Sequence, residues 1–516
     1  MTSSIARALP SALILCLLSM PSSGQDWSSG LGEEAKTSAS AEHGRRYERL
    51  VIRNVHVIDG NGTPIHGPTD VLVEQDRIVR VGRVGSGVEC DAVIDGEGRY
   101  LIPGLISMHS HLQDERAGLD MPFQYQLNLW LASGITTVRD LGCDREKGLE
   151  LRRQSAAGEV IAPRILLYMV AGGGTAEEAR ESVREISAKG ADGIKIFGLD
   201  REAMMALLEE AHEKGLRVAH HAGIAETDAW DDIRGGTTTI EHWYGIPDAA
   251  LPHGSQRFPA GYNYSNELDR FRWAGRLFKE ADERKMSRVL QGMVDAGVAW
   301  DPTLAIYEAA RDAVRAQNQP WFKDYLHPAL EAFFKPSLTS HGSFFLGWTT
   351  EDEIEWKNNY QLWFRALREF AERGGVICVG EDAGFIYRMH GFGLIRELEL
   401  HQEAGFHPLD VLRQATGNNA AVLGMGEELG RIKAGYKADL ALVNGNPLEN
   451  LKLLYPTGTD VYEDGELRTG GTIEWTIKDG YCYRGAVLMQ EVAEIVSEAR
   501  KVRAEEVAKQ GAASGD

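Results

Sequence analysis

The 516-residue chain has little positive charge, few cysteines and no long apolar run beyond its first residues. Its 55 lysines and arginines are outnumbered by 76 acidic residues, which gives a net charge of −21. We find no basic stripe that could follow a phosphate backbone, so we do not expect nucleic-acid binding. No later segment approaches the roughly 20 apolar residues that a transmembrane helix needs, so we expect no membrane span.

Cysteine is equally sparse. Only Cys90, Cys143, Cys378 and Cys482 follow the N-terminal segment, and no two of them have CxxC spacing. A small disulfide-stapled scaffold is therefore excluded, while the formation of individual disulfides stays open.

The N-terminal segment has the order of a signal peptide. An apolar run at residues 8–20 follows the single basic residue Arg7 and leads into small residues. We predict that residues 1–24 are a signal peptide, that the protein is exported to the periplasm or secreted, and that residues 25–47 are a flexible leader. A buried N-terminal helix is the alternative; lipid anchoring at Cys16 is disfavoured because no small residue precedes it.

Short β-branched runs separated by turn residues occur near both ends of the remaining chain. The first group predicts a small antiparallel sheet from four runs: Leu50–Ile58, Val71–Glu74, Ile78–Val81 and Ala92–Asp95. The second group consists of Ala438–Val443 and Ile473–Tyr483. Because the two groups share this pattern, we expect residues 48–100 and 431–485 to form one small β domain.

Between these ends, short apolar runs are mostly followed by helical patterns. Eight runs have this form: Leu101–His111, Gly134–Asp140, Arg164–Ala171, Gly193–Phe197, Arg217–His221, Thr237–His242, Gly297–Pro302 and Val376–Asp382. Eight strand-and-helix units predict an α/β fold, a (β/α)₈ barrel of the TIM type over residues 101–430. A doubly wound open sheet is the alternative, but it normally has fewer strands and a glycine-rich nucleotide turn. The charged pattern of residues 486–516 predicts a final helix.

Side chains that can bind metal occur where these runs end. His109 and His111 are two residues apart on the first run, so both rings face the same side of a strand and can share one ion. Four more stand at or near the ends of later runs: Lys195, His221, His242 and Asp382. A barrel gathers its functional side chains at the carboxyl ends of its strands, so we expect all of them at one rim. Any one of these six residues could be an ordinary core or loop residue. That explanation would have to hold for all six, although each stands at or near the end of a predicted strand.

Several segments around these residues match known motifs. They are residues 101–111 (LIPGLISMHSH), 191–196 (ADGIKI), 218–222 (VAHHA), 239–242 (TIEH), 380–384 (GEDAG), 415–421 (ATGNNAA) and 435–440 (GYKADL). Through them the chain resembles the amidohydrolase superfamily, the barrel metalloenzymes related to imidazolonepropionase and to the Xaa-Pro and Xaa-Arg dipeptidases. The resemblance covers most of residues 50–485, and it implies that the small β domain is a β-sandwich.

The resemblance also implies a centre with two divalent metal ions. It assigns the ligands as His109, His111 and Asp382 on one ion, His221 and His242 on the other, and Lys195, carboxylated by CO₂, bridging both. The carbamate is chemically reasonable, since free lysine repels a dication whereas its carbamate is an anionic ligand with two oxygens. Imidazole and carboxylate ligands suit zinc, our first choice, although manganese, cobalt and iron also accept these residue types.

The activity implied by the resemblance is hydrolysis of an amide C–N bond, in dipeptides or N-acyl amino acids. A metal-bridging hydroxide would attack the carbonyl, and Asp382 would carry the proton to the leaving nitrogen. The same site would also serve a cyclic amide, a lactone or another ester. A barrel that has lost activity and only binds a ligand or partner is the alternative from a different class.

The chain departs from the superfamily pattern at two positions. Glu381 stands where a threonine commonly precedes the catalytic aspartate, and on a strand its side chain should point to the opposite face, toward the sandwich or a helix. His220 stands where an apolar residue is common, so either His220 or His221 could be the ligand. We choose His221 because Ala222 then falls where the motif has it.

The regions after the sixth and seventh runs are long and aromatic. Eight of the eleven tryptophans lie between Trp230 and Trp363. Long loops at this end of a barrel shape the pocket, so we expect a bulky, partly apolar substrate; packing of extra helices is the alternative for these rings.

Three residues beyond the strand ends are expected to bind substrate. Tyr244 lies two residues after His242, and Arg388 and His390 follow Asp382 closely. An arginine fork suits a substrate carboxylate because it can donate to both oxygens at once. The expected partner is thus a small or dipeptide-like substrate; we also expect a homo-oligomer, whose size the sequence leaves open.

Overall fold

The structure is a computed structural model. It describes residues 39–223, 226–263, 266–337, 345–463 and 465–513. The predicted signal peptide and the first part of the predicted leader lie outside the described residues. The rest of that leader is not loose chain, because β1 (Ala39–Ser40) pairs with β6 and β2 (Arg45–Arg46) pairs with β21. Among the described helices, none is long and apolar enough to cross a bilayer.

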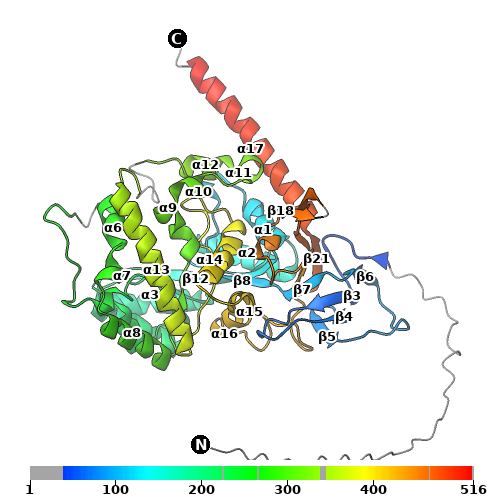
Figure 1. The fold of residues 1–516 in the computed structure, drawn as a ribbon, viewed down its shortest axis with the longest axis horizontal. Helices are drawn as coiled ribbons and strands as arrows, with labels where there is room; N and C mark the ends of the chain where they lie inside the picture. The colour runs from blue at the N-terminus through cyan, green and yellow to red at the C-terminus, as the bar shows by residue number, and fades with distance from the viewer. Residues whose placement is uncertain (1–38, 224–225, 264–265, 338–344, 464, 514–516) are drawn as a thin grey trace, which may run out of the picture. The chain divides into compact units, whose positions relative to one another are not determined.

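One mixed sheet draws its strands from both ends of the chain, as the sequence predicts. It contains β1, β2, β3 (Arg49–Val57), β4 (His66–Glu74), β5 (Arg77–Val81), β6 (Ala92–Asp95), β7 (Tyr100–Pro103), β17 (Leu440–Val443), β20 (Ile473–Lys478) and β21 (Tyr481–Arg484). β7 pairs antiparallel with β17, which joins the N-terminal and C-terminal strands (Figure 1). The prediction of a purely antiparallel N-terminal sheet is wrong, since β3 runs parallel to both β6 and β7.

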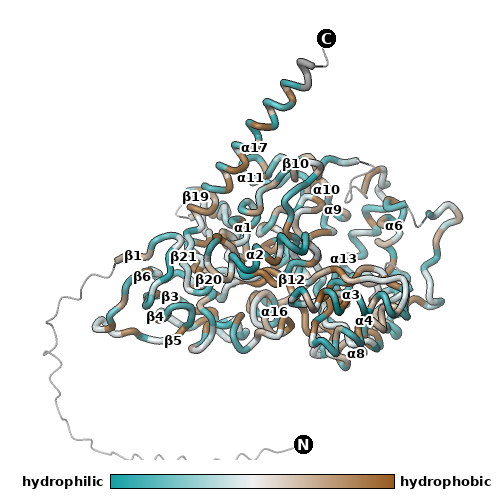
Figure 2. The backbone as a smooth tube through the Cα atoms, turned by 180° about the vertical axis from the view of Figure 1, so that it is seen from behind, coloured by the Kyte–Doolittle hydropathy of each residue, from teal (hydrophilic) through white to brown (hydrophobic). Residues whose placement is uncertain are grey.

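A second sheet of seven parallel strands forms the barrel wall. In spatial order its strands are β8 (Leu105–Ser110), β11 (Ile135–Asp140), β12 (Arg164–Ala171), β13 (Gly193–Ile196), β14 (Arg217–His220), β15 (Thr239–Glu241) and β16 (Ala299–Asp301). Figure 2 shows apolar chain along central strands such as β12, and alternating polar and apolar residues along the outer helices. This is the pattern of a barrel core covered by amphipathic helices.

The eighth predicted run lies between β16 and β8, the two edge strands of the seven-stranded sheet, without forming a continuous strand. The Cys378 N–H donates to the Trp300 carbonyl of β16 at 2.8 Å, and the Met108 N–H of β8 donates to the Val379 carbonyl at 3.0 Å. Gly380 follows, and a Cβ there would lie 2.6 Å from the His109 Cβ. The segment therefore bridges the two edge strands, and its close approach to β8 requires glycine.

The first predicted run divides into two strands that belong to different sheets. β7 pairs in the mixed sheet and β8 in the barrel, with Gly104 between them. A Cβ at Gly104 would lie 2.2 Å from the Thr136 hydroxyl oxygen. The sequence pattern predicted a single run here, because it cannot show that the pairing partners change after Gly104.

Helices surround the barrel and fill its long loops. Those around the barrel include α1 (Phe123–Ala132), α2 (Arg145–Ala157), α3 (Ala176–Ala188), α4 (Arg201–Glu213), α5 (Ala229–Gly235), α8 (Glu283–Ala296), α13 (Thr350–Glu372), α14 (Phe392–Glu403), α15 (Pro408–Arg413) and α16 (Asn419–Val422). Those within the long loops include α6 (Glu267–Ala274), α7 (Leu277–Glu280), α9 (Glu308–Arg311), α10 (Ala313–Gln317), α11 (Phe322–Tyr325) and α12 (Pro328–Phe333). The final helix, α17 (Gly485–Ala513), buries Leu488, Val492 and Val496 and packs against α1.

Candidate metal centre

One cavity of about 520 Å³ is lined by all the residues that the sequence places at the barrel rim. They are His109 in β8, His111 just beyond it, Lys195 in β13, His221 after β14, His242 after β15 and Asp382 at the end of the eighth run. The parallel strands bring these residues together because their carboxyl ends share one edge of the sheet.

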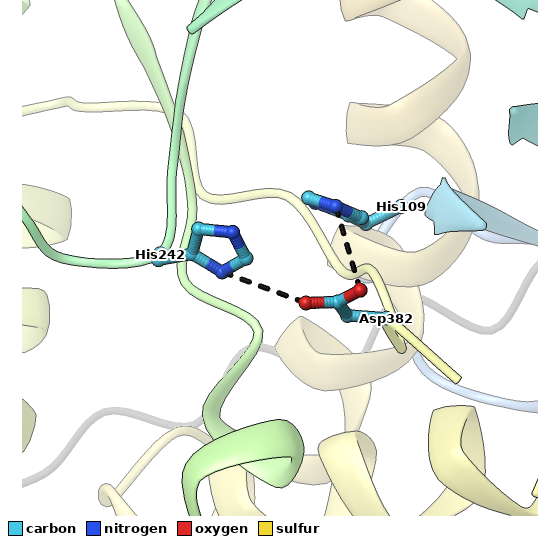
Figure 3. A group of neighbouring side chains, drawn as sticks. All are labelled: His109, His242 and Asp382. Atoms are coloured by element: carbon cyan, nitrogen blue, oxygen red, sulfur yellow. Dashed lines mark ion pairs between the residues drawn. The ribbon is translucent and has the colours of Figure 1, made fainter. Parts of the chain in front are cut away.

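Asp382 lies at the centre of three histidines. Its Oδ1 is 3.1 Å from His111 Nε2. Its Oδ1 is also 3.7 Å from His109 Nε2, and its Oδ2 is 3.9 Å from His242 Nδ1 (Figure 3). The ring centroids of His109 and His242 are 4.9 Å apart. A carboxylate and three imidazoles at these separations form a donor set of the kind that holds a divalent transition-metal ion.

The other side of the cluster contains His221 and Lys195. The ring centroids of His221 and His242 are 4.4 Å apart. Lys195 is 1% exposed, and within the described parts of the chain its Nζ has no hydrogen-bond partner. A buried amine without such a partner is costly, so its surroundings fit a modified or metal-bound lysine better than a free ammonium group.

The two adjacent histidines at the end of β14, His220 and His221, have different surroundings. The ring of His220 is fully buried, with Nδ1 2.8 Å from the Asp232 carboxylate of α5. The ring of His221 lines the cavity and stacks on Tyr244 at 5.5 Å between centroids. Neighbouring residues along a strand point to opposite faces, which explains why only His221 lines the cavity.

Two of the rim residues have a backbone conformation that is uncommon for side chains other than glycine. His242 has φ of 63° and Asp382 has φ of 47°. Such positive φ angles cost free energy, and they recur at functional sites because they direct a side chain to a specific place.

The electrostatics of the cluster favour neutral imidazoles. Burial lowers the pKa of His109, His221 and His242, and the positive charge of Lys195 lowers each of these pKa values further. Burial also lowers the pKa of Lys195 to about 8. Burial alone would raise the pKa of Asp382, but His109 and His111 hold it well below its usual value. Neutral imidazole and ionised carboxylate are the forms that bind metal.

The wall of the cavity above this cluster is largely aromatic. It includes the predicted Tyr244 together with Phe258, Tyr262, Phe271, Tyr307 and Phe385. Among the described residues that line this cavity there is no tryptophan, and four of the tryptophans of this region, Trp243, Trp300, Trp356 and Trp363, are buried in the core. Packing therefore accounts for these four tryptophans.

Two residues predicted to bind substrate have other surroundings. Arg388 is 4% exposed; its Nη2 donates to Glu308 Oε2 at 2.7 Å and its Nε donates to the Ala305 carbonyl at 2.7 Å. His390 is fully buried, with its ring edge-on to Trp130. Neither residue lines the cavity. Their proximity to Asp382 in sequence was misleading, because the chain turns into the core after the strand end.

Another arginine does line the cavity. Arg270, from α6, borders it together with Gln256 and Asp248. Burial raises the pKa of Asp248 to about 6. Arg270 was not predicted as a site residue because it lies far from every strand end, and its one signal in the sequence was its place in the long aromatic loop.

Glu381, whose role the sequence left open, contacts a helix. Its Oε2 accepts from the N–H groups of Gly391 at 2.8 Å and Leu394 at 3.1 Å, at the N-terminus of α14, and its Oε1 accepts from Trp130. A buried carboxyl group here satisfies the free donors of the first helical turn.

Known proteins match this chain at the level of sequence and of fold. The sequence profile of the amidohydrolase family matches residues 100–253 and 365–468. The imidazolonepropionase of Rubrobacter xylanophilus is 25% identical over 409 residues, covering 73% of this chain and 85% of that protein. A Xaa-Pro dipeptidase crystallised with methionine in its active site is 20% identical with a TM-score of 0.60, covering 84% of this chain and 100% of that one.

Other similarities are local. The dihydroorotase of Thermus aquaticus is 38% identical over 65 residues, which are 13% of this chain and 14% of that protein. The chain therefore matches only about one seventh of the length of that relative.

Proposed function

The chain belongs to the amidohydrolase family, and from this premise we propose that it is a metal-dependent hydrolase of amide C–N bonds in dipeptides or N-acyl amino acids. One observation carries the proposal. Four imidazoles, a lysine without a hydrogen-bond partner among the described residues and an aspartate, from separate parts of the barrel, line one cavity. The same site could accept a cyclic amide, a lactone or another ester.

The residues present fit a centre of two ions. His109, His111 and Asp382 would hold one, and His221 and His242 the other. Lys195 would bridge them as its carbamate, which forms when the neutral amine adds to CO₂ and releases a proton. We propose zinc as the metal. Two bound ions would polarise the substrate carbonyl and supply a water ligand that ionises near neutral pH.

Asp382 is suited to proton transfer in this reaction. Its carboxylate lies at the cavity surface beside three imidazoles, and its pKa is held low, so it is ionised and able to accept a proton from the attacking water. It would then deliver this proton to the leaving nitrogen, which departs as a neutral amine.

The cavity wall favours a substrate with an apolar body and a carboxylate. Aromatic side chains supply most of the wall, and Arg270 is the arginine that borders it among the described residues. We therefore assign to Arg270 the carboxylate-binding role that the sequence suggested for Arg388. Tyr244 would contact the substrate close to the metals, since its ring stacks on His221.

The decisive experiment screens zinc- and bicarbonate-loaded protein against dipeptide and N-acyl amino acid libraries, with elemental analysis of the same sample. We expect two metals per chain and turnover of substrates that have an apolar residue and a free carboxylate. Metal without turnover of any amide, but with turnover of lactones, would replace the proposed substrate class. No metal and no turnover would favour a ligand-binding barrel.

We also propose that the protein is exported after cleavage near residue 24. N-terminal sequencing of protein from the extracytoplasmic fraction should begin close to Gln25. An intact N-terminus on active cytoplasmic protein would contradict export. The homo-oligomer stays a prediction, which light scattering would measure.

A further inference from the structure

Charged side chains are packed inside the barrel next to the rim. Arg139 in β11, Glu241 in β15 and Asp301 in β16 are all 0% exposed, and none of them lines the cavity. Charged groups are rarely buried so completely unless they are paired, so these contacts need an explanation.

Arg139 connects the group. Its Nη2 donates to Glu241 Oε1 at 2.7 Å and lies 3.4 Å from Asp301 Oδ2, and its Nη1 donates to the Thr239 hydroxyl at 2.9 Å. The guanidinium also lies over the ring of Tyr168, 5.1 Å from its centroid. These contacts fix the position of the Glu241 carboxylate.

Glu241 in turn contacts one of the rim histidines. Its Oε1 accepts from Arg139 and from the Thr239 hydroxyl, while its Oε2 is 2.8 Å from His109 Nδ1. The opposite nitrogen of that ring, Nε2, faces Asp382 at 3.7 Å. His109 therefore lies between a buried carboxylate and the cavity.

A second metal site here is disfavoured by the charge of Arg139. Ligand atoms of His109, Glu241 and Asp301 lie within 4.8 Å of one another, which is close enough to surround an ion. The Arg139 guanidinium already contacts both carboxylates, however, and it would repel a dication at this place. The cluster is therefore better explained as a support for the ligand above it.

We propose that Glu241, held by Arg139, is a positioning residue that fixes the tautomer and orientation of His109 for metal binding; this rests on the proposed metal centre. An ionised carboxylate only accepts hydrogen bonds, so the proton of the neutral ring stays on Nδ1. The lone pair of Nε2 is then directed into the cavity. Carboxylates that orient metal-binding histidines in this way also increase the basicity of the ligand.

The position requires a group with two acceptor oxygens. In Glu241→Gln, one oxygen becomes an NH₂ donor that must face either Arg139, which itself donates, or His109. Facing His109, the NH₂ needs Nδ1 as its acceptor, which moves the ring proton to Nε2 and blocks metal binding. Glu241→Asp keeps the charge beside Arg139 but withdraws the carboxylate from His109 by one methylene group.

Glu381→Gln is the matched control. Glu381 is also a fully buried carboxyl group directly before a rim residue. Among the described residues its carboxyl oxygens accept from Trp130 and from the N-terminus of α14, and only its backbone N–H contacts His109, at the carbonyl oxygen. Both glutamine variants therefore alter a buried carboxyl group, and only Glu241→Gln alters a group that contacts the His109 ring.

The test measures zinc affinity by competition with a chelator, together with the visible spectrum of cobalt-loaded protein and thermal unfolding of the metal-free forms. We expect Glu241→Gln and Glu241→Asp to weaken zinc binding by about 10- to 100-fold and to change the cobalt spectrum. Glu381→Gln should lower the melting temperature and leave zinc affinity within about twofold of the wild type.

The outcomes separate this inference from the proposed function. Wild-type zinc affinity in both Glu241 variants, or equal losses in Glu241→Gln and Glu381→Gln, would overturn the positioning role. Should Glu241→Gln not fold, the zinc affinity of Glu241→Asp decides the question. A wild-type protein that binds no zinc would instead refute the metal centre itself.

Discussion

Two regions border the same cavity, the rim and the wall. They differ in polarity and in the kind of backbone that holds their side chains. The rim is polar. Five of its six side chains lie in a barrel strand or directly after one, as His109 and Lys195 do in β8 and β13, and Asp382 lies at the end of the eighth run. The wall is mainly aromatic and comes from loops and short helices such as α6. The hydrogen-bonded sheet gives the rim the rigidity that metal binding needs, while the loops can vary with the substrate. Substitutions at the rim should therefore change turnover and metal content, and those in the wall should change substrate selection.

The largest effect is expected at Asp382. Asp382→Asn removes the proton acceptor but keeps an oxygen that can contact the metal, so kcat should fall by about 10³-fold or more with most metal retained. Steady-state kinetics and elemental analysis of the same preparation measure both quantities. Full activity in this variant would reject the proton role.

Lys195 tests whether the rim depends on CO₂. Lys195→Ala should lose at least one metal and activity by about 10²-fold or more, because no anionic group remains to bridge the ions. Acetate or propionate added in excess should restore part of the activity by occupying the vacated position. Unchanged metal content and kcat would show that the lysine is not a ligand.

Arg270 tests the wall. Arg270→Ala should raise KM for carboxylate-bearing substrates by about 10- to 100-fold through loss of a charge-assisted hydrogen bond, while neutral amides change little. Kinetics on a substrate and its amidated analogue measure the difference. An equal change for both would remove the carboxylate assignment.

Arg388→Ala is the control for Arg270. It removes one partner of the buried Glu308, which retains Arg396 as a second partner. We expect destabilisation by about 1–3 kcal/mol without selectivity between the acid and its amide. A selective loss of activity on the carboxylate-bearing substrate would assign carboxylate binding to Arg388 instead.

The smallest effect is expected at Asp248. Because its pKa is raised from 3.8 to about 6, the native state binds a proton more readily than the unfolded chain between these values. Stability is therefore lost as the pH rises through this window, and the cost is complete above about pH 6. Asp248→Asn should raise the melting temperature by about 1 °C at pH 8 and not at pH 4. An equal shift at both pH values would show that the carboxyl group is not the cause.

The rim was predictable from sequence because its residues are tied to strand ends. A short apolar run such as Gly193–Ile196 predicts a buried strand. Parallel strands of a barrel place their carboxyl ends at the same edge of the sheet. Glu241 also carried a signal that went unused, since a charged residue in a short apolar strand needs a partner inside the barrel. That partner, Arg139, lies 102 positions away, and no local pattern joins the two.

The wall was less predictable because position after a strand does not determine the direction of a loop. Arg388 and His390 lie within eight residues of Asp382 and are packed into the core, whereas Arg270 lies far from any strand end and borders the cavity. Glu308 explains why Arg388 is packed into the core. A buried carboxylate needs a positively charged partner, and Arg388 forms an ion pair with it.

The amino-acid sequence alone determined the class of fold and the residues that gather at the rim, since apolar runs and the polar side chains at their ends are local features. Tertiary structure alone decided that residues 101–111 contribute strands to two sheets, that Asp232 contacts His220, and which arginine borders the cavity. Each of these outcomes depends on which distant groups compete for the same partner or the same space. The outcome depends on the packing of side chains and the pairing of buried charges, and both are established only when the whole chain is folded.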